Sequence, residues 1–464
     1  MAVEFWPIEK VTPAEYNPRR INDAKIEVLK ESITKTGFII PILVNTKNNT
    51  IIAGHQRTKT ANLLGLKTIP VNPVKDIRLG DEVRFNQIHN SIDLTLDNRP
   101  RLLSDEYDKE QFVYIPPEKF QVKTARASSL KETCELIVRY GNCLSCIVCK
   151  NEVVYGAEYV KACQLLKLPV TTYIADDSKY QDLRYYLRQD YGEFCYEDIE
   201  RHTYVQGLAQ MFRNPEGEVG TKIRNHSPLH SRWAIPYLKE AGKGTRVLDF
   251  GCGRGDYVPI MTKLGFPSTG VEFYNHNGAA INTAKGNRMI DGLIKELKEN
   301  GLFDVVICCG VFNSVDSLEA EDAVMTCLNL FTKDKVFISG RIRDYVEAAM
   351  NNARGGTMRS AMNFFDKDGF SANYRKGHWF FQKFHNRQQI EDLAHTHGFK
   401  INKLFYTKNA STWYCFLEKI DNLPEEQYHK AVNFEFGLVL PNKKRYNRQD
   451  EVWDVVKSIY NFEG

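Results

Sequence analysis

The glycine-rich segment at 246–258, with the sequence RVLDFGCGRGDYV, constrains this chain more than any other feature. A short apolar run ends in Asp249 and is followed by three glycines in alternate positions, beginning at Gly251. Because glycine lets the backbone turn tightly beside a ligand, this pattern predicts a strand, a turn and a helix at a binding site. Roughly twenty residues later, Glu272 ends a second apolar run. An acid at this place typically binds the ribose hydroxyls of a nucleoside, so the pattern predicts a nucleoside-binding α/β sheet.

Three later segments extend this pattern. Apolar runs at 303–312 and 335–342 predict the fourth and fifth strands of the sheet, and 399–419 predicts a terminal hairpin. Together with D-F-G-C-G-R-G at 249–255, this order resembles the class I S-adenosylmethionine-dependent methyltransferases over residues 225–420. The resemblance implies a Rossmann-like seven-stranded sheet and S-adenosylmethionine as the cofactor. A dinucleotide dehydrogenase is the alternative, and the terminal hairpin and the lack of a second mononucleotide half argue against it.

The same resemblance assigns roles to residues at the predicted sheet edge. It implies that Asp249 and the first two glycines frame the methionine part of the cofactor and that Glu272 binds the ribose. The expected cofactor residues are Asp249, Gly251, Cys252, Gly253, Gly255, Glu272, Asp291 and Cys309. For Asp291, a surface acid is the other interpretation. The catalytic candidates, beyond the fourth strand, are Asn313 and Asp316. The residues preceding the first strand, where such enzymes cover their cofactor or simply pack a helix, are His226, His230, Arg232 and Trp233.

The segment after the fourth strand does not define the methyl acceptor. DNA amino-methyltransferases have an Asp/Asn-Pro-Pro-aromatic run there, whereas this chain has Cys-Gly-Val-Phe at 309–312. Cytosine C5 enzymes have a Pro-Cys nucleophile, and Cys308 and Cys309 lack the proline. We therefore interpret both as thiols at the end of a buried strand. Because methyl transfer needs an aligned, desolvated nucleophile, positioning can supply the catalysis.

Two segments have the composition of a nucleic-acid surface. An insertion at 343–384 interleaves aromatic and cationic side chains, which stack on bases and bind phosphates. The tail has a basic run, PNKKRYNR, at 441–448. The nucleic-acid candidates are Arg354, Tyr374, Arg375, Lys376, Trp379, Lys443, Lys444 and Arg445. A solvated surface is the alternative for both segments, since the net charge of the whole chain is only +4.

The front of the chain resembles a second family. NPRR at 17–20, SITKTGFIIPILV at 32–44 and IIAGHQRTKTANLLGLKTIPV at 51–71 are similar to the ParB/sulfiredoxin-like domain, over residues 5–75. The resemblance implies that residues at a helix start hold nucleotide phosphates, where free N–H groups and the helix dipole favour anions. The matching residues are Asn17, Arg19, Gly54, His55, Gln56 and Arg57. A solvated helix start is the alternative. Sulfiredoxin chemistry is unsupported, because Gly54 stands where that enzyme has its cysteine.

The region around 110–175 looks like a degenerate second copy of this unit. GNCLSCIV at 141–148 is similar to GFIIPILV at 37–44, and the glycine of 152–168 aligns with Gly54. The aligned residues Ala157, Glu158 and Tyr159 lack the phosphate-binding groups, which predicts a scaffold lobe beside one binding lobe. Coincidence between two similar units is the alternative. The spacing of Cys143, Cys146 and Cys149 suggests an iron–sulfur site, but a buried strand is the favoured interpretation, because residues three apart point to opposite faces of a strand. The alignment supports it by placing Cys143 and Cys146 opposite Ile39 and Ile42.

A chain of 464 residues exceeds one compact domain. We expect a ParB/sulfiredoxin-like α+β domain at 1–100, a degenerate second lobe at 101–178, a helical linker at 179–224, a methyltransferase domain at 225–420 and a basic helical tail at 421–464. No apolar run approaches the roughly 20 residues of a membrane span, and no signal peptide is visible. These features predict a cytoplasmic protein with no membrane partner.

The favoured function is S-adenosylmethionine-dependent methylation of DNA or another nucleic acid, in a bacterial or phage modification system. The front half would bind a nucleoside triphosphate or the nucleic acid itself. A small-molecule or nucleotide methyltransferase is the first alternative. A nucleotide-binding DNA adaptor that works through Arg57, with a non-catalytic methyltransferase half, is the second.

Overall fold

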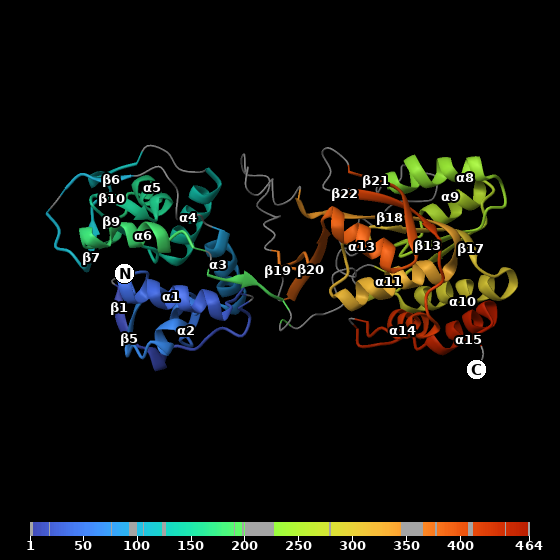
Figure 1. The fold of residues 1–464 in the computed structure, drawn as a ribbon, viewed down its shortest axis with the longest axis horizontal. Coiled ribbons are helices and arrows are strands. Elements are labelled where there is room, and N and C mark those ends of the chain that lie inside the picture. Colours follow the sequence, from blue (N-terminus) through green and yellow to red (C-terminus); the bar gives the residue numbers. More distant parts are fainter. Residues whose placement is uncertain are drawn as a thin grey trace. The chain divides into compact units, whose positions relative to one another are not determined.

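The computed structural model describes residues 3–17, 19–75, 77–91, 100–104, 106–122, 127–189, 191–196, 199, 227–277, 280–344, 365–375, 378–406, 412–440 and 442–462. They form two compact units, one chiefly of residues up to 199 and one chiefly of residues from 227 onward (Figure 1). Within the described residues, no helix combines the length and the apolar composition that crossing a membrane requires.

The first unit contains two lobes, and the N-terminal lobe is a four-stranded sheet packed against helices. Its strand order is β1–β5–β3–β4, with β3 and β5 parallel and the other neighbours antiparallel. Helix α1 begins at Asn22, whose side chain accepts the Lys25 N–H, and ends at Gly37, whose φ of 89° suits a glycine. The elements are β1 (Glu4–Pro7), β2 (Arg19–Arg20), α1 (Asp23–Thr36), β3 (Ile42–Asn45), β4 (Thr50–Ala53), α2 (His55–Leu63), β5 (Thr68–Val74) and α3 (Leu79–Ser91).

The second lobe repeats this strand order. Its sheet runs β7–β11–β9–β10, again with the middle pair parallel and the outer pairs antiparallel, and then continues with β6 and β8. The elements are β6 (Arg101–Leu102), β7 (Gln111–Ile115), β8 (Phe120–Gln121), α4 (Ala127–Tyr140), β9 (Cys146–Cys149), β10 (Glu152–Tyr155), α5 (Ala157–Leu166), β11 (Val170–Ile174), α6 (Tyr180–Tyr186) and β12 (Glu193–Phe194). The prediction of a buried cysteine strand is confirmed for Cys146 and Cys149, which bound β9. Cys143 is also buried, but it precedes this strand.

The two lobes share one apolar core. Leu43 and Phe85 of the first lobe pack in the same cluster as Ile115 and Leu136 of the second. The amide of Asn72 donates to the Cys143 carbonyl at 2.9 Å, and this contact is buried. The lobes therefore form one packed body (Figure 1).

The second unit is built on an eight-stranded sheet. Parallel strands run in the order β14–β13–β17–β18, and antiparallel β22 and then β21 follow. The hairpin β19–β20 joins only the last two residues of β18. The sheet therefore has one strand more than the seven expected. The insertion adds two strands, whereas the segment between β14 and β17 holds a helix and a short separate hairpin in its described residues.

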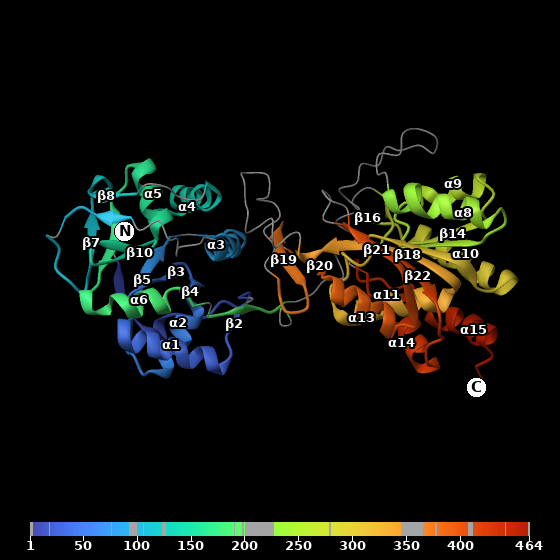
Figure 2. The same ribbon diagram turned by 45° about the horizontal axis from the view of Figure 1, so that its top comes forward.

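Helices cover both faces of this sheet (Figure 2). Helices α8 and α9 lie on one face and α10 and α11 on the other, with α14 and α15 packed against α11 and α10. The strands are β13 (Val247–Phe250), β14 (Ser268–Val271), β15 (His276–Asn277), β16 (Ala280–Ile281), β17 (Phe303–Cys309), β18 (Thr332–Ile342), β19 (Phe370–Arg375), β20 (His378–His385), β21 (Phe399–Tyr406) and β22 (Thr412–Lys419). The helices are a π-turn (Leu229–Ala234), α8 (Ile235–Ala241), α9 (Tyr257–Lys263), α10 (Thr283–Asn300), α11 (Leu318–Phe331), α13 (Arg387–Thr396), α14 (Glu425–Phe436) and α15 (Gln449–Tyr460).

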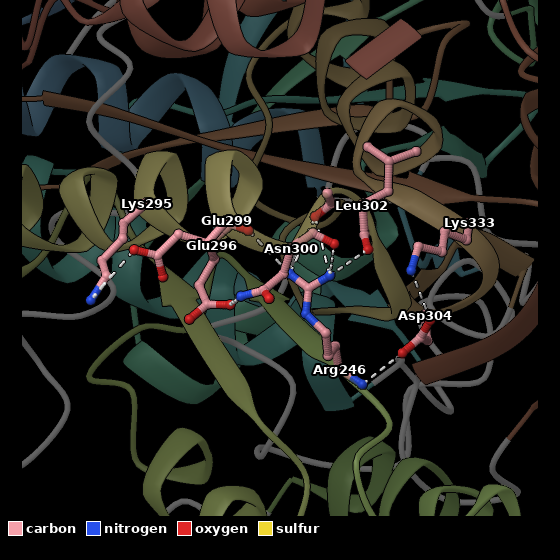
Figure 3. A network of polar contacts seen from close by, with 9 residues as sticks. Arg246, Lys295, Glu296, Glu299, Asn300, Leu302, Asp304 and Lys333 are labelled. Atoms are coloured by element: carbon pink, nitrogen blue, oxygen red, sulfur yellow. Dashed lines mark hydrogen bonds and ion pairs between the residues drawn. The ribbon is translucent and has the colours of Figure 1, made fainter. Parts of the chain in front are cut away.

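Arg246, at the start of β13, fixes the end of α10 beside the sheet (Figure 3). Its guanidinium donates to the carbonyls of Asn300 at 2.7 Å and Leu302 at 2.8 Å, and it pairs with Glu296 at 3.4 Å. The last carbonyls of a helix have no partner inside the helix, and a cation suits the negative end of its dipole. The Arg246 side chain therefore supplies hydrogen-bond donors to the backbone carbonyls between α10 and β17.

Replacing Arg246 with alanine should destabilise this unit by about 2–3 kcal/mol, because the variant cannot make the several charge-assisted hydrogen bonds to backbone carbonyls. Urea unfolding of the full chain checks this. The control is Lys295→Ala in the same helix, since the Lys295–Glu299 pair is exposed and long at 4.0 Å. An equal decrease in stability in the two variants would contradict the assigned role.

Candidate functional site

Strands β13, β14 and β17 end at one edge of the sheet, and the predicted cofactor residues gather there. Asp249 pairs in register with Gly270 of β14 and Ile307 of β17. The turn after β13 has left-handed glycines, with φ of 75° at Gly251 and 64° at Gly253. The predicted sequence of strand, glycine-rich turn and helix is confirmed.

The Asp249 carboxyl group is buried, and one of its oxygens contacts the His230 imidazole. The His230 Nε2 lies 3.1 Å from Asp249 Oδ2. Burial by itself would lower the pKa of His230, but the Asp249 carboxylate outweighs burial and raises this pKa to about 10. The other oxygen, Oδ1, is buried and has no hydrogen bond within the described chain. The edge therefore contains a buried carboxyl group with one oxygen that the described residues leave unpaired.

The same histidine reaches the end of β17 through Ser227. The His230 Nδ1 lies 2.8 Å from Ser227 Oγ, which lies 3.1 Å from Cys309 Sγ. With the imidazole protonated, Nδ1–H donates to the hydroxyl and the hydroxyl donates to the sulfur. Burial opposes ionisation of the thiol, but His230 outweighs it and lowers the pKa of Cys309 below its ordinary value. Cys309 therefore has the surroundings of a thiolate.

Glu272 lies across the edge from this chain of contacts. Its carboxylate accepts the backbone N–H groups of Gly253 and Tyr274, each at 2.9 Å. Glu272 lines a cavity of about 40 Å³ together with Gly251 and Asp316. A Cβ on Gly251 would lie 2.3 Å from Val311 Cγ2, so the space above this glycine is filled by Val311.

The other predicted residues lie around this centre. Gly255 continues the turn with φ of 79°, and Cys252 packs against Gly270 of β14. Asp291 is on the exposed face of α10 and pairs with Arg448 at 2.8 Å, so the structure places it in an ion pair outside the cavity lining. Asn313 is not in the cavity lining either; its amide donates to Ser314 Oγ at 3.3 Å.

Of the four residues predicted before the first strand, His230 alone joins the site among those described. Trp233 packs on Phe405 at 4.7 Å between ring centroids, and Arg232 is exposed. His226 lies outside the described residues.

The nucleic-acid candidates are described only in part. Arg354 and Lys376 lie outside the described residues, and only the backbone of Tyr374 and Arg375 is described, in β19. Trp379 is half-buried in β20. Lys443, Lys444 and Arg445 are all exposed.

All six residues predicted for nucleotide binding in the first lobe line one cavity of about 270 Å³: Asn17, Arg19, Gly54, His55, Gln56 and Arg57. Gly54, with φ of 105°, precedes α2, and a Cβ there would lie 2.6 Å from Ile42 Cγ2. Burial lowers the pKa of His55 to about 4, so the imidazole is neutral and accepts the Ala14 N–H at 3.1 Å. Arg57 Nη1 donates to the Ile40 carbonyl.

The second lobe differs at the corresponding positions. Gly156 has the same left-handed conformation, with φ of 86°. Tyr159, the counterpart of Arg57, is fully buried, and its hydroxyl bonds to Asn142 at 2.6 Å and Thr171 N–H at 3.1 Å. The tyrosine is therefore part of the apolar core, whereas Arg57 lines a cavity.

Sequence reasoning missed several residues of both sites. Tyr155 of the second lobe, with Tyr186 and Tyr191, forms a wall of the first-lobe cavity. Ser227 and Glu435 belong to the sheet edge. No local signal identifies the three tyrosines or Glu435, because they come from distant segments. Ser227 lies in the segment before the first strand, beside the predicted His226 and His230.

Comparisons with known proteins agree with this geometry. The model of the ParB N-terminal domain matches residues 2–91, and that of a methyltransferase domain matches residues 228–404. The ParB-like nuclease domain-containing protein YnaK of Escherichia coli is 31% identical over 71 residues, which are 15% of this chain and 80% of that protein. The probable chromosome-partitioning protein ParB of Coxiella burnetii is 39% identical over 74 residues, but the chain spans only 26% of that protein.

Among solved structures, magnesium protoporphyrin IX methyltransferase of Synechocystis with bound S-adenosylmethionine is similar to 48% of this chain and 99% of its own, at 14% identity and a TM-score of 0.29. The chain belongs to the family of proteins with a ParB-like N-terminal domain. Its second unit carries a methyltransferase domain, and the protein is an S-adenosylmethionine-dependent methyltransferase.

The residues at the edge fit the chemistry of this cofactor. The unpaired Asp249 Oδ1 is suited to the ammonium of the methionine part. The cavity beside Glu272 is small, however, since about 40 Å³ holds about three water-sized probes. The side chains on its rim must therefore move when a nucleoside enters.

Replacing His230 with glutamine should raise the pKa of Cys309, because the imidazolium that stabilises the thiolate is removed. The pH dependence of iodoacetamide labelling, read on the Cys309 peptide by mass spectrometry, measures this pKa. The control is His395→Gln at an exposed position of α13. A labelling midpoint that stays the same in H230Q would contradict the assigned contact.

Proposed function

We propose that this methyltransferase acts on a nucleic acid and that its ParB-like lobe binds a nucleotide or the nucleic acid. The proposal adds the chemical class of the methyl acceptor to the methyltransferase activity described above. A bacterial or phage modification system is the setting that we propose for this activity.

The observation that carries the proposal is a basic turn held beside the cofactor edge. Tyr446 donates its hydroxyl to the Phe273 carbonyl at 2.6 Å, in the loop that follows Glu272. Next to this anchor stand three exposed cations, Lys443, Lys444 and Arg445. Cations fixed near a reaction centre would bind the phosphates of a polymeric substrate and position its bases.

The first-lobe cavity supports the second half of the proposal. Its six predicted residues surround a volume of about 270 Å³ at the N-terminus of α2. The free N–H groups of a helix start favour an anion, and Arg57 supplies a charged donor. The Tyr155 and Tyr186 rings offer surfaces on which a base would stack.

The cofactor supplies a methyl group on a sulfonium. In our proposal the chain's own residues hold the cofactor and exclude water: Asp249 binds the ammonium, and Glu272 the ribose. The acceptor would approach from the loop after β17, where Asn313 lies. Alignment of donor and acceptor is then the main catalytic contribution.

One observation favours a second candidate, a small-molecule or nucleotide methyltransferase. Phe312, the aromatic residue after β17, is fully buried and packs at 6.2–6.3 Å against the rings of Trp413 and His385. It therefore offers no face on which a flipped base would stack.

Labelled S-adenosylmethionine separates the two candidates. We expect transfer of the labelled methyl group to DNA or RNA. The triple variant Lys443→Ala, Lys444→Ala, Arg445→Ala should raise KM for the polymer about tenfold. Its salt dependence should be shallower by about 0.9 for each phosphate that the variant no longer neutralises.

The matched control removes three exposed lysines elsewhere on the same unit: Lys239, Lys263 and Lys298. The proposal is wrong if only small molecules or free nucleotides are labelled, or if both triple variants behave alike.

Calorimetry should also separate the two binding sites. Asp249→Asn should weaken S-adenosylhomocysteine binding at least about tenfold, which corresponds to about 1.4 kcal/mol, because the ammonium has no carboxylate partner in this variant. Arg57→Ala should weaken nucleoside triphosphate binding in the same way. Each variant should keep the other ligand. Equal weakening of both ligands in either variant would overturn the two-site proposal.

A further inference from the structure

Helix α14 contributes a wall of the cofactor cavity although it lies outside the matched methyltransferase domain. That match ends at residue 404, and α14 spans Glu425–Phe436. The cavity lining contains Phe434, Glu435 and Leu438 from this region, opposite Glu272 and Asp316. The tail is therefore part of the site.

The position of α14 is fixed by the core of the unit. Tyr428 donates its hydroxyl to Asn329 Oδ1 of α11 at 2.5 Å, and Val432 is fully buried. The Phe436 ring packs at 5.2 Å from that of Phe273, in the loop after Glu272. Because the helix is anchored at both ends, the room that a nucleoside needs must come from side chains on the rim, and Glu435 stays at the wall.

The Glu435 side chain is buried at the cavity wall. It is 5% exposed. Burying a polar group is costly unless a ligand or another group pairs with it. It lines the same cavity as two further acids, Glu272 and Asp316.

The groups around Glu435 favour its neutral form. Burial contributes most, and the charges of Glu272, after β14, and Asp316, before α11, add to it; together they raise the pKa of Glu435 to about 8. The other titratable groups that interact with it are the buried thiols of Cys308 in β17 and Cys327 in α11. At neutral pH this side chain therefore has both an O–H donor and a carbonyl acceptor.

We propose that Glu435 binds the adenine ring of the cofactor, pairing its carbonyl with the N6 amino group and its O–H with the adjacent ring nitrogen. The adenine edge presents a donor beside an acceptor, which a neutral carboxyl matches and a carboxylate does not. The proposal rests on the assignment of Glu272 to the ribose, because the base must then lie in the same cavity. It makes the C-terminal helix a part of the cofactor site.

A purely structural role is the competing explanation, and the variants are chosen to separate the two. Glu435→Gln keeps a donor and an acceptor but does not titrate, whereas Glu435→Leu fills the space and has neither. The control is Glu426→Gln, at an exposed position of the same helix. Thermal unfolding without ligand reports the structural contribution of each change.

Calorimetry on the full chain uses two probes, S-adenosylhomocysteine and 5′-methylthioadenosine, which lacks the titrating amine. We expect the wild-type chain to bind methylthioadenosine about tenfold more weakly at pH 9 than at pH 6.5, because one pH unit above the pKa leaves about a tenth of the acid neutral. E435Q should abolish this pH dependence and keep most of the affinity. E435L should bind both probes at least about tenfold more weakly at pH 6.5.

Failure has two distinguishable forms. If the wild-type chain binds neither probe, the assignment of this edge to the cofactor is wrong, and the proposal fails with it. If the wild-type chain binds but E435Q and E435L retain its affinity and its pH dependence, only the role of Glu435 is wrong. Normal binding by E426Q is required for the second conclusion.

Discussion

Parallel strands that end at one edge of a sheet force their last side chains together, and in this chain several of those side chains are acids. Asp249 and Glu272 end β13 and β14 and are both buried. Buried carboxylates need compensating partners. His230 provides one for Asp249, and backbone N–H groups provide two for Glu272. The same histidine contacts Ser227, which contacts Cys309, so the residues that compensate Asp249 also reach the end of β17.

The two lobes of the first unit share a strand order but differ in the side chains at the start of the equivalent helix. Both lobes have the same strand order and a left-handed glycine before the equivalent helix, Gly54 and Gly156. In the first lobe Arg57 follows and a cavity remains open; in the second Tyr159 follows and is fully buried. The duplication of the ParB-like domain stays a prediction, since the match to that domain covers only residues 2–91. The second lobe supplies Tyr155 to the cavity of the first, so a lobe without binding residues of its own still shapes a site.

The tail ties the two proposals for the second unit together. Tyr446 and Phe436 both contact Phe273, the residue that follows Glu272. One anchor therefore holds the basic turn near the cofactor edge, and the other holds Glu435 in the cavity wall. In these two proposals, a substitution in the tail would weaken both cofactor binding and substrate binding, because both depend on the loop that contains Phe273.

The sequence by itself determined the local frame: the strand, turn and helix around Gly251, the glycine before α2, the buried cysteine strand and the two domain classes. These features follow from apolar periodicity and glycine conformation, which act over a few residues. The sequence also identified Asp249, Glu272 and Arg57 as candidates, because each stands at a fixed position relative to a strand end or a helix start. Only the tertiary structure decided which distant groups meet them. Nothing in the local pattern places Glu435 beside Glu272, Tyr155 beside Arg57 or Arg448 beside Asp291, because these contacts depend on how whole helices and lobes pack.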